Sequence, residues 1–203
     1  MTKLLRYEKL FISLRYYLLG KAYFTALRAL DFAKLHHTGL RKDGVNPELI
    51  HQIEICLYIT TLKNLGNEQL CLTVALLHDL LESDFGVSPK DIEFRFGKDS
   101  ADAVWLVTKT YQGKDKDLNT YFEEISKCPV ASIVKGADRI NNVQSMVGVF
   151  TKEKQKAYLK EVEDKFLPMI KRAKHSFPEQ SSEYFNIEHI LKSQINLIQS
   201  TLK

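Results

Sequence analysis

The stretch at residues 69–82, QLCLTVALLHDLLE, is apolar at almost every position except for an adjacent His78 and Asp79 near its end. A helix that is apolar on all sides usually lies at the centre of a bundle, so we expect a central helix over residues 69–81. An unpaired buried carboxylate is costly, and Asp79 therefore needs a partner. One possible partner is a metal ion that both Asp79 and His78 bind. In the alternative, Asp79 forms a salt bridge and His78 caps a neighbouring backbone group.

The rest of the chain has the same helical character. Apolar residues recur every three or four positions, and Gly, Pro and polar clusters separate the segments. The pattern predicts further helices over 4–18, 23–37, 47–65, 88–97, 101–111, 118–127, 130–147, 152–174 and 183–202. Asn67 and Ser88 are expected as N-caps. Residues 38–47, TGLRKDGVNP, are expected to form a loop, and no stretch indicates a strand. The expected fold is all-α, a compact single-domain bundle of about eight to ten helices over residues 1–203.

The composition is that of an ordinary globular protein, with 44% hydrophobic and 27% charged residues. A formal net charge of +4 suits a small anionic ligand and is too low to indicate duplex nucleic acid as a partner. Cys56, Cys71 and Cys128 form no CxxC pair, so we expect buried thiols in a reducing compartment. No apolar run is long enough to span a membrane, and charged residues interrupt the apolar N-terminal stretch. We therefore expect a cytoplasmic protein with no membrane partner.

Two further polar residues stand where the pattern favours apolar ones. Asp138 follows apolar helix positions in residues 134–142, VKGADRINN, and His51 lies in the first turns of a helix behind the basic loop. With His78 and Asp79 they make a set of two imidazoles and two carboxylates. Such a mixed set suits Mn²⁺, Fe²⁺ or Zn²⁺ better than Mg²⁺ or Ca²⁺. Four protein ligands on a six-coordinate ion leave positions for water and substrate, as metal-assisted hydrolysis requires.

At these residues the sequence resembles the HD-domain phosphohydrolases. The resemblance is greatest to the hydrolase domain of the Rel/Spo alarmone enzymes and to their stand-alone small hydrolases, and it covers residues 25–170 approximately, leaving an extra helix at each end. The matching positions are Phe32-Ala33, His36, Arg41-Lys42-x-Gly44, His51, Ala75-Leu76-Leu77-His78-Asp79-x-x-Glu82, Phe96-Gly97, Val107-Thr108-Lys109 and Lys135-x-Ala137-Asp138-Arg139-x-x-Asn142.

The resemblance implies a nucleotide hydrolase with one divalent metal ion. The ion is usually Mn²⁺, with Fe²⁺, Zn²⁺ or Co²⁺ as the alternatives, and the reaction removes pyrophosphate from the ribose 3′ position of guanosine tetra- or pentaphosphate. The positions that match the family's metal ligands are His51, His78, Asp79 and Asp138. The expected partner is thus a small anionic nucleotide, and an oligomer is compatible with the sequence.

The same resemblance assigns roles around the metal. Glu82 matches the acidic residue that activates the attacking water, and Asp84 is its expected helper. The positions that match substrate contacts are Arg41, Lys42, Asn142, Lys154 and Tyr158. Arg41 and Lys42 stand on a glycine-containing loop, where a guanidinium can grip phosphate through two hydrogen bonds and an ammonium acts as a point charge.

The chain departs from the family pattern at three places. Ser83 stands where the family has an aspartate beside its glutamate, residues 45–48 read VNPE in place of Glu-Pro-Tyr, and Asn141 replaces a common histidine. Two alternatives follow from these departures. The enzyme hydrolyses another nucleotide, such as a deoxynucleoside triphosphate, a nucleoside monophosphate or a phosphorylated dinucleotide, or the protein is a catalytically weak sensor that binds a nucleotide.

Overall fold

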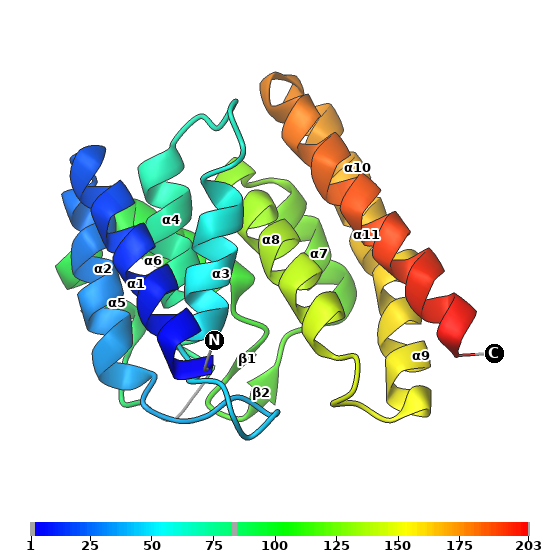
Figure 1. Cartoon of the computed structure of the whole chain (residues 1–203). Coiled ribbons are helices and arrows are strands. Elements are labelled where there is room, and N and C mark those ends of the chain that lie inside the picture. Colours follow the sequence, from blue (N-terminus) through cyan, green and yellow to red (C-terminus); the bar gives the residue numbers. More distant parts are fainter. Residues whose placement is uncertain (1–2, 83–84, 203) are drawn as a thin grey trace.

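The structure is a computed structural model that describes residues 3–82 and 85–202 (Figure 1). The elements are α1 Lys3–Gly20, α2 Phe24–His36, α3 Ile50–Ile59, α4 Glu68–Leu77, α5 Pro89–Phe96, α6 Lys98–Val107, β1 Thr110–Tyr111, β2 Lys114–Asp115, α7 Leu118–Ser126, α8 Pro129–Ser145, α9 Lys152–Glu161, a π-helical turn η1 Val162–Phe166, α10 Leu167–Ser176, a 3₁₀ turn η2 Pro178–Gln180 and α11 Ser181–Thr201. Counting α9, η1 and α10 as one continuous helix, the described residues form ten α-helices, which confirms the all-α fold expected from the sequence.

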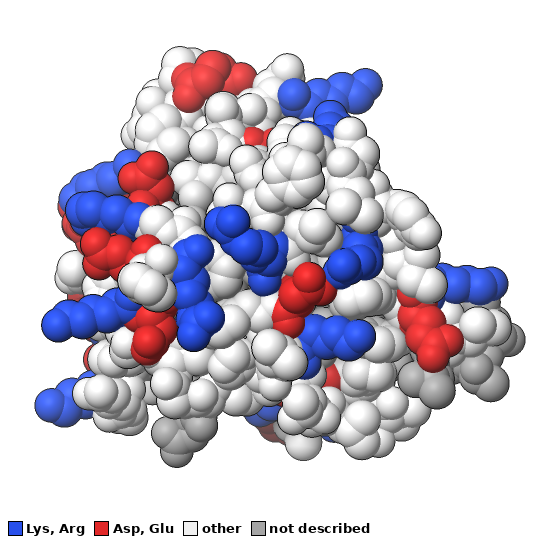
Figure 2. Space-filling model, turned by 90° about the vertical axis from the view of Figure 1, so that its left-hand side faces the viewer, with Lys and Arg blue, Asp and Glu red and all other residues white. Residues whose placement is uncertain are grey.

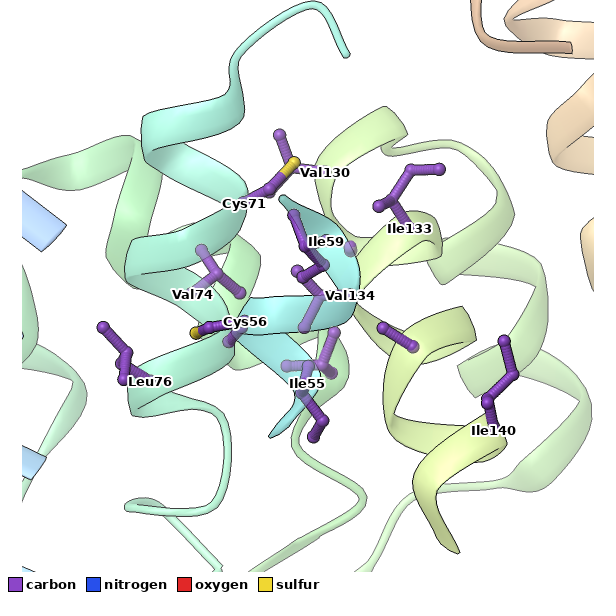
Figure 3. Close-up of a cluster of buried hydrophobic side chains, with 14 of the residues drawn as sticks. Ile55, Cys56, Ile59, Cys71, Val74, Leu76, Val130, Ile133, Val134 and Ile140 are labelled. Atoms are coloured by element: carbon purple, nitrogen blue, oxygen red, sulfur yellow. The ribbon is translucent and has the colours of Figure 1, made fainter. Parts of the chain in front are cut away.

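Helix α4 lies at the centre of the bundle, as its all-round apolar sequence predicts. Every residue from Cys71 to Leu77 is buried, and the helix packs against α2, α3, α6 and α8. Figure 3 shows one part of this core, where side chains of α3 and α4 meet those of α8. Because α3 and α8 carry expected metal ligands and the other two directly follow α4, this buried apolar contact also fixes the relative positions of the ligands.

The expected N-caps are present. Asn67 accepts a hydrogen bond from the backbone N–H of Leu70 at 3.0 Å, and Ser88 forms a capping box with Asp91 at the start of α5. These caps satisfy backbone donors that a helix leaves unpaired in its first turn.

Helices α3 and α4 are shorter than expected. Helix α3 begins at Ile50 because Pro47 pairs with Leu40 in a β-bridge and the chain then makes a tight turn. It ends at Ile59, where the Thr60 hydroxyl donates to a carbonyl of the preceding turn. Helix α4 ends at Leu77, so the His-Asp pair lies in the turn that follows the helix and not within it.

Two further differences lie in the second half of the chain. The expected helix over 101–111 is α6 followed by β1, which pairs with β2 in a short hairpin. Its turn residues Gln112 and Gly113 both have positive φ, the geometry of a tight two-residue hairpin, and Gln112 gives no sequence signal for it. The expected helix over 152–174 contains the π turn η1. Pro168 has no N–H to donate to the preceding turn, and the Leu167 N–H reaches back to the Val162 carbonyl instead.

Several chain segments meet at one end of the bundle, the lower end in Figure 1. Helix α3 begins there and α4 ends there, and the α2–α3 loop, the β1–β2 hairpin and the α8–α9 loop lie around them. The face that includes α2 and α5 carries interspersed basic and acidic side chains (Figure 2). Among the described helices, none is both long and apolar enough to cross a membrane.

Candidate metal centre

The structure brings the two histidines and two aspartates of the sequence prediction together. His51 is in the first turn of α3, His78 and Asp79 follow the end of α4, and Asp138 is in α8. The Nε2 atom of His51 lies 3.1 Å from Oδ1 of Asp138 and 3.8 Å from Oδ2 of Asp79. The Nε2 atom of His78 lies 3.0 Å from Oδ1 of Asp79 and 3.8 Å from Oδ1 of Asp138. Four potential ligand residues therefore lie side by side, with Asp79 and Asp138 each close to both imidazoles.

Hydrogen bonds on the far side of each ring direct the Nε2 atoms toward the two carboxylates. Nδ1 of His51 lies 2.7 Å from Oδ1 of Asn141, and Nδ1 of His78 lies 2.8 Å from the carbonyl oxygen of Ala75. Both partners are acceptors, so each Nδ1 donates its proton away from the centre and each Nε2 faces the centre. Asn141 is fixed in turn, because its Nδ2 donates to Glu54 at 2.9 Å.

These atoms fit a single divalent ion. With bonds of about 2.1 Å, neighbouring ligands of one ion lie about 3 Å apart, close to the shorter separations here. His51, His78 and Asp79 each offer an atom within 4.8 Å of the others. The Nε2 atom of His78 is buried and lies 3.0 Å from Oδ1 of Asp79, yet it makes no hydrogen bond of good geometry in the described part of the chain. A buried nitrogen that faces carboxylates without a well-formed hydrogen bond is typical of a metal ligand. The His/Asp donors suit a borderline transition-metal ion.

The charges of the centre perturb its pKa values. Burial acts to lower the pKa of His78, but the Asp79 and Asp138 carboxylates outweigh it and raise that pKa to about 10. Burial acts to raise the pKa of Asp138, but Lys135 and the two histidines hold it well below its usual range. His78 and His51 likewise lower the pKa of Asp79 against its burial. The carboxylates are therefore ionised at neutral pH, and an incoming metal ion displaces a proton from His78.

Three polar side chains contact the expected ligands. Two of them, Lys135 and Gln52, were not among the predicted site residues, and the third, Asn142, was expected to contact the substrate. The Lys135 ammonium lies 2.9 Å from Oδ2 of Asp138, and its side chain is 11% exposed. Gln52 donates to Oδ2 of Asp79 at 3.0 Å, and Asn142, an expected substrate contact, donates to Oδ1 of Asp138. The signal for Lys135 was its position one helical turn before Asp138.

A cavity of about 510 Å³ opens over this centre. Its wall contains His51, Asp79 and Asp138, whereas the buried His78 does not line it. Of the residues expected around the substrate, the wall contains Arg41, Lys42, Glu82, Asn142 and Tyr158.

Lys154 is the expected substrate contact that the structure leaves outside the cavity. Its side chain is exposed, and its ammonium lies 4.0 Å from the centre of the Phe150 ring, whose other neighbours include Lys42 at 5.6 Å. Phe150 lines the cavity, so Lys154 lies at the rim, on the Phe150 ring and not in the cavity wall itself. The prediction that Lys154 touches substrate phosphate therefore needs a side-chain movement.

Glu82 lies at the edge of the cavity beside the hairpin. One of its oxygens accepts a hydrogen bond from the backbone N–H of Lys109, which fixes the carboxylate and leaves its second oxygen for another partner. Asp84, the expected helper, lies outside the described residues.

Tyr158, in the cavity wall, is held by a buried arginine. The Arg139 guanidinium lies 4.6 Å from the centre of the Tyr158 ring and is paired with Glu161 at 3.1 Å. This stack fixes the ring while the cavity remains open to it.

An all-helical bundle with a His-Asp pair and two further ligands on neighbouring helices defines the HD-domain class. In sequence the chain is 33% identical, over 152 residues that cover 71% of it, to a guanosine-3′,5′-bis(diphosphate) 3′-pyrophosphohydrolase of Aquifex aeolicus (strain VF5). The chain spans 21% of the length of that relative. No family model matches the chain.

A solved structure has the same fold. It is that of a metazoan ortholog of SpoT that hydrolyses ppGpp, and it superposes with a TM-score of 0.65 at 23% identity, covering 85% of this chain and 94% of the other. The chain is therefore a relative of the SpoT/Rel-type HD-domain proteins, which confirms the resemblance seen in the sequence.

Proposed function

We propose that the protein is a metal-dependent nucleotide hydrolase that removes pyrophosphate from the ribose 3′ position of guanosine tetra- or pentaphosphate. The observation that carries the proposal is the convergence of two imidazole nitrogens and two carboxylates at the floor of a cavity whose wall contains Arg41, Lys42 and Lys135. The curated relative is named for this reaction, and it supplies the choice of substrate.

His51, His78, Asp79 and Asp138 would hold the metal ion, and Mn²⁺ is the ion we propose. When bound, it supplies Lewis-acid activation of the phosphate and of the attacking water. The second carboxylate oxygen of Glu82 takes a proton from that water. The water oxygen bonds to the phosphorus attached to ribose O3′, the P–O3′ bond breaks, and O3′ receives the proton that Glu82 took. The products are pyrophosphate and a nucleoside 5′-diphosphate from the tetraphosphate, or a 5′-triphosphate from the pentaphosphate.

The cations of the cavity wall offset the charge of the substrate. Lys135 is beside the metal ligands, so it serves the phosphate that reacts, whereas Arg41 and Lys42 on the α2–α3 loop serve phosphates farther from the centre. In a cavity partly shielded from water, such fixed positive charges stabilise the charge that develops on the phosphate oxygens.

The apolar wall of the cavity suits the rest of a nucleotide. It is formed by Leu40, Met146, Val149, Phe150 and Tyr158. We propose that residues 1–203 act as one domain, because one buried apolar cluster includes residues from α1 to α11. Three expectations stay predictions: that the partner is a small nucleotide, that the protein does not bind duplex nucleic acid, and that it is cytoplasmic.

The test is pyrophosphate release from guanosine tetraphosphate with Mn²⁺, beside a panel of other nucleotides. We expect release with the wild type and loss of both metal content and hydrolysis in Asp79→Ala. Asp102→Ala is the matched control, because Asp102 is an exposed aspartate paired only with Lys98 among the described residues. Hydrolysis by metal-free Asp79→Ala would contradict the mechanism. Hydrolysis of another nucleotide alone would contradict the substrate, and metal binding without any turnover would favour the sensor.

A further inference from the structure

Glu48 is a carboxylate in the cavity wall that the metal centre and the proposed hydrolysis leave unused. It lies in the turn before α3, and its backbone carbonyl accepts a hydrogen bond from the N–H of the ligand His51 at 3.2 Å. Its backbone N–H donates to the carbonyl of Gly39 at 2.9 Å, which ties it to the other arm of the α2–α3 loop. Its position beside the metal centre is therefore fixed by the backbone on both sides.

A buried histidine faces one oxygen of this carboxylate. Nδ1 of His37 lies 3.5 Å from Oε2 of Glu48, and the His37 side chain is 1% exposed against 34% for Glu48. His37 is itself held by the edge of the Phe85 ring, 5.1 Å away between ring centres. In residues 3–82 and 85–202, no lysine or arginine pairs with Glu48, although Arg41 and Lys42 line the same cavity. Oε1 of Glu48 is thus the oxygen left for a ligand.

The chemistry of a carboxylate limits what this oxygen can bind. It repels a phosphate group and accepts hydrogen bonds from hydroxyl or N–H groups. In nucleotide sites in general, an Asp or Glu accepts a hydrogen bond from the ribose 2′-hydroxyl. The phosphate that reacts at the metal centre is bonded to ribose O3′, so the neighbouring 2′-hydroxyl is the donor that lies closest to the centre, and Glu48 is one helical turn from the ligand His51.

We propose that Glu48 accepts a hydrogen bond from the ribose 2′-hydroxyl and makes the site selective for ribonucleotides over 2′-deoxyribonucleotides. This inference rests on the proposed function, because it needs a nucleotide whose 3′-phosphate lies at the metal centre.

The experiment compares guanosine 3′,5′-bis(diphosphate) with its 2′-deoxy analogue, and measures kcat/KM for both in the wild type and three variants. A hydrogen bond from a hydroxyl to a charged acceptor corresponds to a preference of about 10- to 100-fold for the ribonucleotide. Glu48→Gln keeps a neutral acceptor and should show a smaller preference, and Glu48→Ala should show a ratio near one. Glu93→Ala, an exposed glutamate on α5, is the control that should keep the full preference.

Each result decides between the two proposals. Hydrolysis of both compounds at equal kcat/KM in the wild type, or a preference that persists in Glu48→Ala, would overturn the role of Glu48 and leave the proposed function in place. If neither compound is hydrolysed, calorimetric binding of the two compounds measures the same ratio. A protein that neither hydrolyses nor binds them would overturn the proposed function, and this inference with it.

Discussion

The bond between Asn141 and His51 predicts how a residue that is not a ligand affects metal binding. Oδ1 of Asn141 accepts from Nδ1 of His51 at 2.7 Å and so holds the proton on that nitrogen. In Asn141→Ala the imidazole can rotate and can exchange its proton between the two nitrogens. Loss of such a supporting bond lowers metal affinity about 10- to 100-fold, which corresponds to about 1.4–2.7 kcal/mol.

The assay is calorimetric titration of the metal-free protein with Mn²⁺, together with urea unfolding of the same samples. Asn119→Ala is the matched control, since Asn119 bonds to Lys165 on the surface, away from the centre. The control should bind Mn²⁺ as the wild type does. An affinity of Asn141→Ala within twofold of the wild type would refute the reasoning that Asn141 directs Nε2 of His51 toward the ion.

Two further predictions concern the stability of the fold. The pKa of His78 is raised from its ordinary value of 6.5 to about 10, so in metal-free protein its contribution to stability is complete below pH 6.5 and is lost as the pH rises toward 10. The unfolding free energy of metal-free protein should therefore fall between pH 6.5 and pH 10, by at most about 1.4 kcal/mol per pH unit. An unfolding free energy that does not change with pH would contradict this prediction. The same slope in the His78→Gln variant would contradict it as well. Gly136→Ala would place a methyl group 2.7 Å from Cδ1 of Ile187, so the Ile187 side chain between α8 and α11 must shift. Gly136→Ala should lower the free energy of unfolding, measured in urea, by about 1–3 kcal/mol. Gly66→Ala is the control, because an added methyl group there meets no atom within 4 Å. Equal stability of the two variants would argue against close packing of Gly136 on Ile187.

The sequence predicts the core of this fold well because its clearest feature, an apolar central segment, determines where that segment lies in the whole fold. Residues 71–77 are apolar on every side, and such a segment has no stable place except among other helices. The ends of α4 are less predictable. Leu80 and Leu81 continue the apolar pattern and are buried, yet the chain has already left the helix at His78, which the hydropathy pattern does not indicate.

The candidate site divides in the same way. The four residues expected as ligands stood out because polar residues in apolar helical segments need partners, and the structure brings all four together. Their role as metal ligands stays a prediction. Asn141 acts through a contact between α8 and α3 that no local pattern encodes. Lys135 lies one helical turn before Asp138 on the same helix, so its role was within reach of the sequence. Lys154 matches a position in a motif, but the ring of Phe150 stands between it and the cavity.

The proposed ligands come from three separate stretches of chain, and the last of them is Asp138 in α8. During synthesis on the ribosome the set remains incomplete until this residue has emerged and α8 has packed against α3 and α4. Uptake of the proposed ion would consequently follow the emergence of α8, and truncated products that end before α8 would lack one of its proposed ligands.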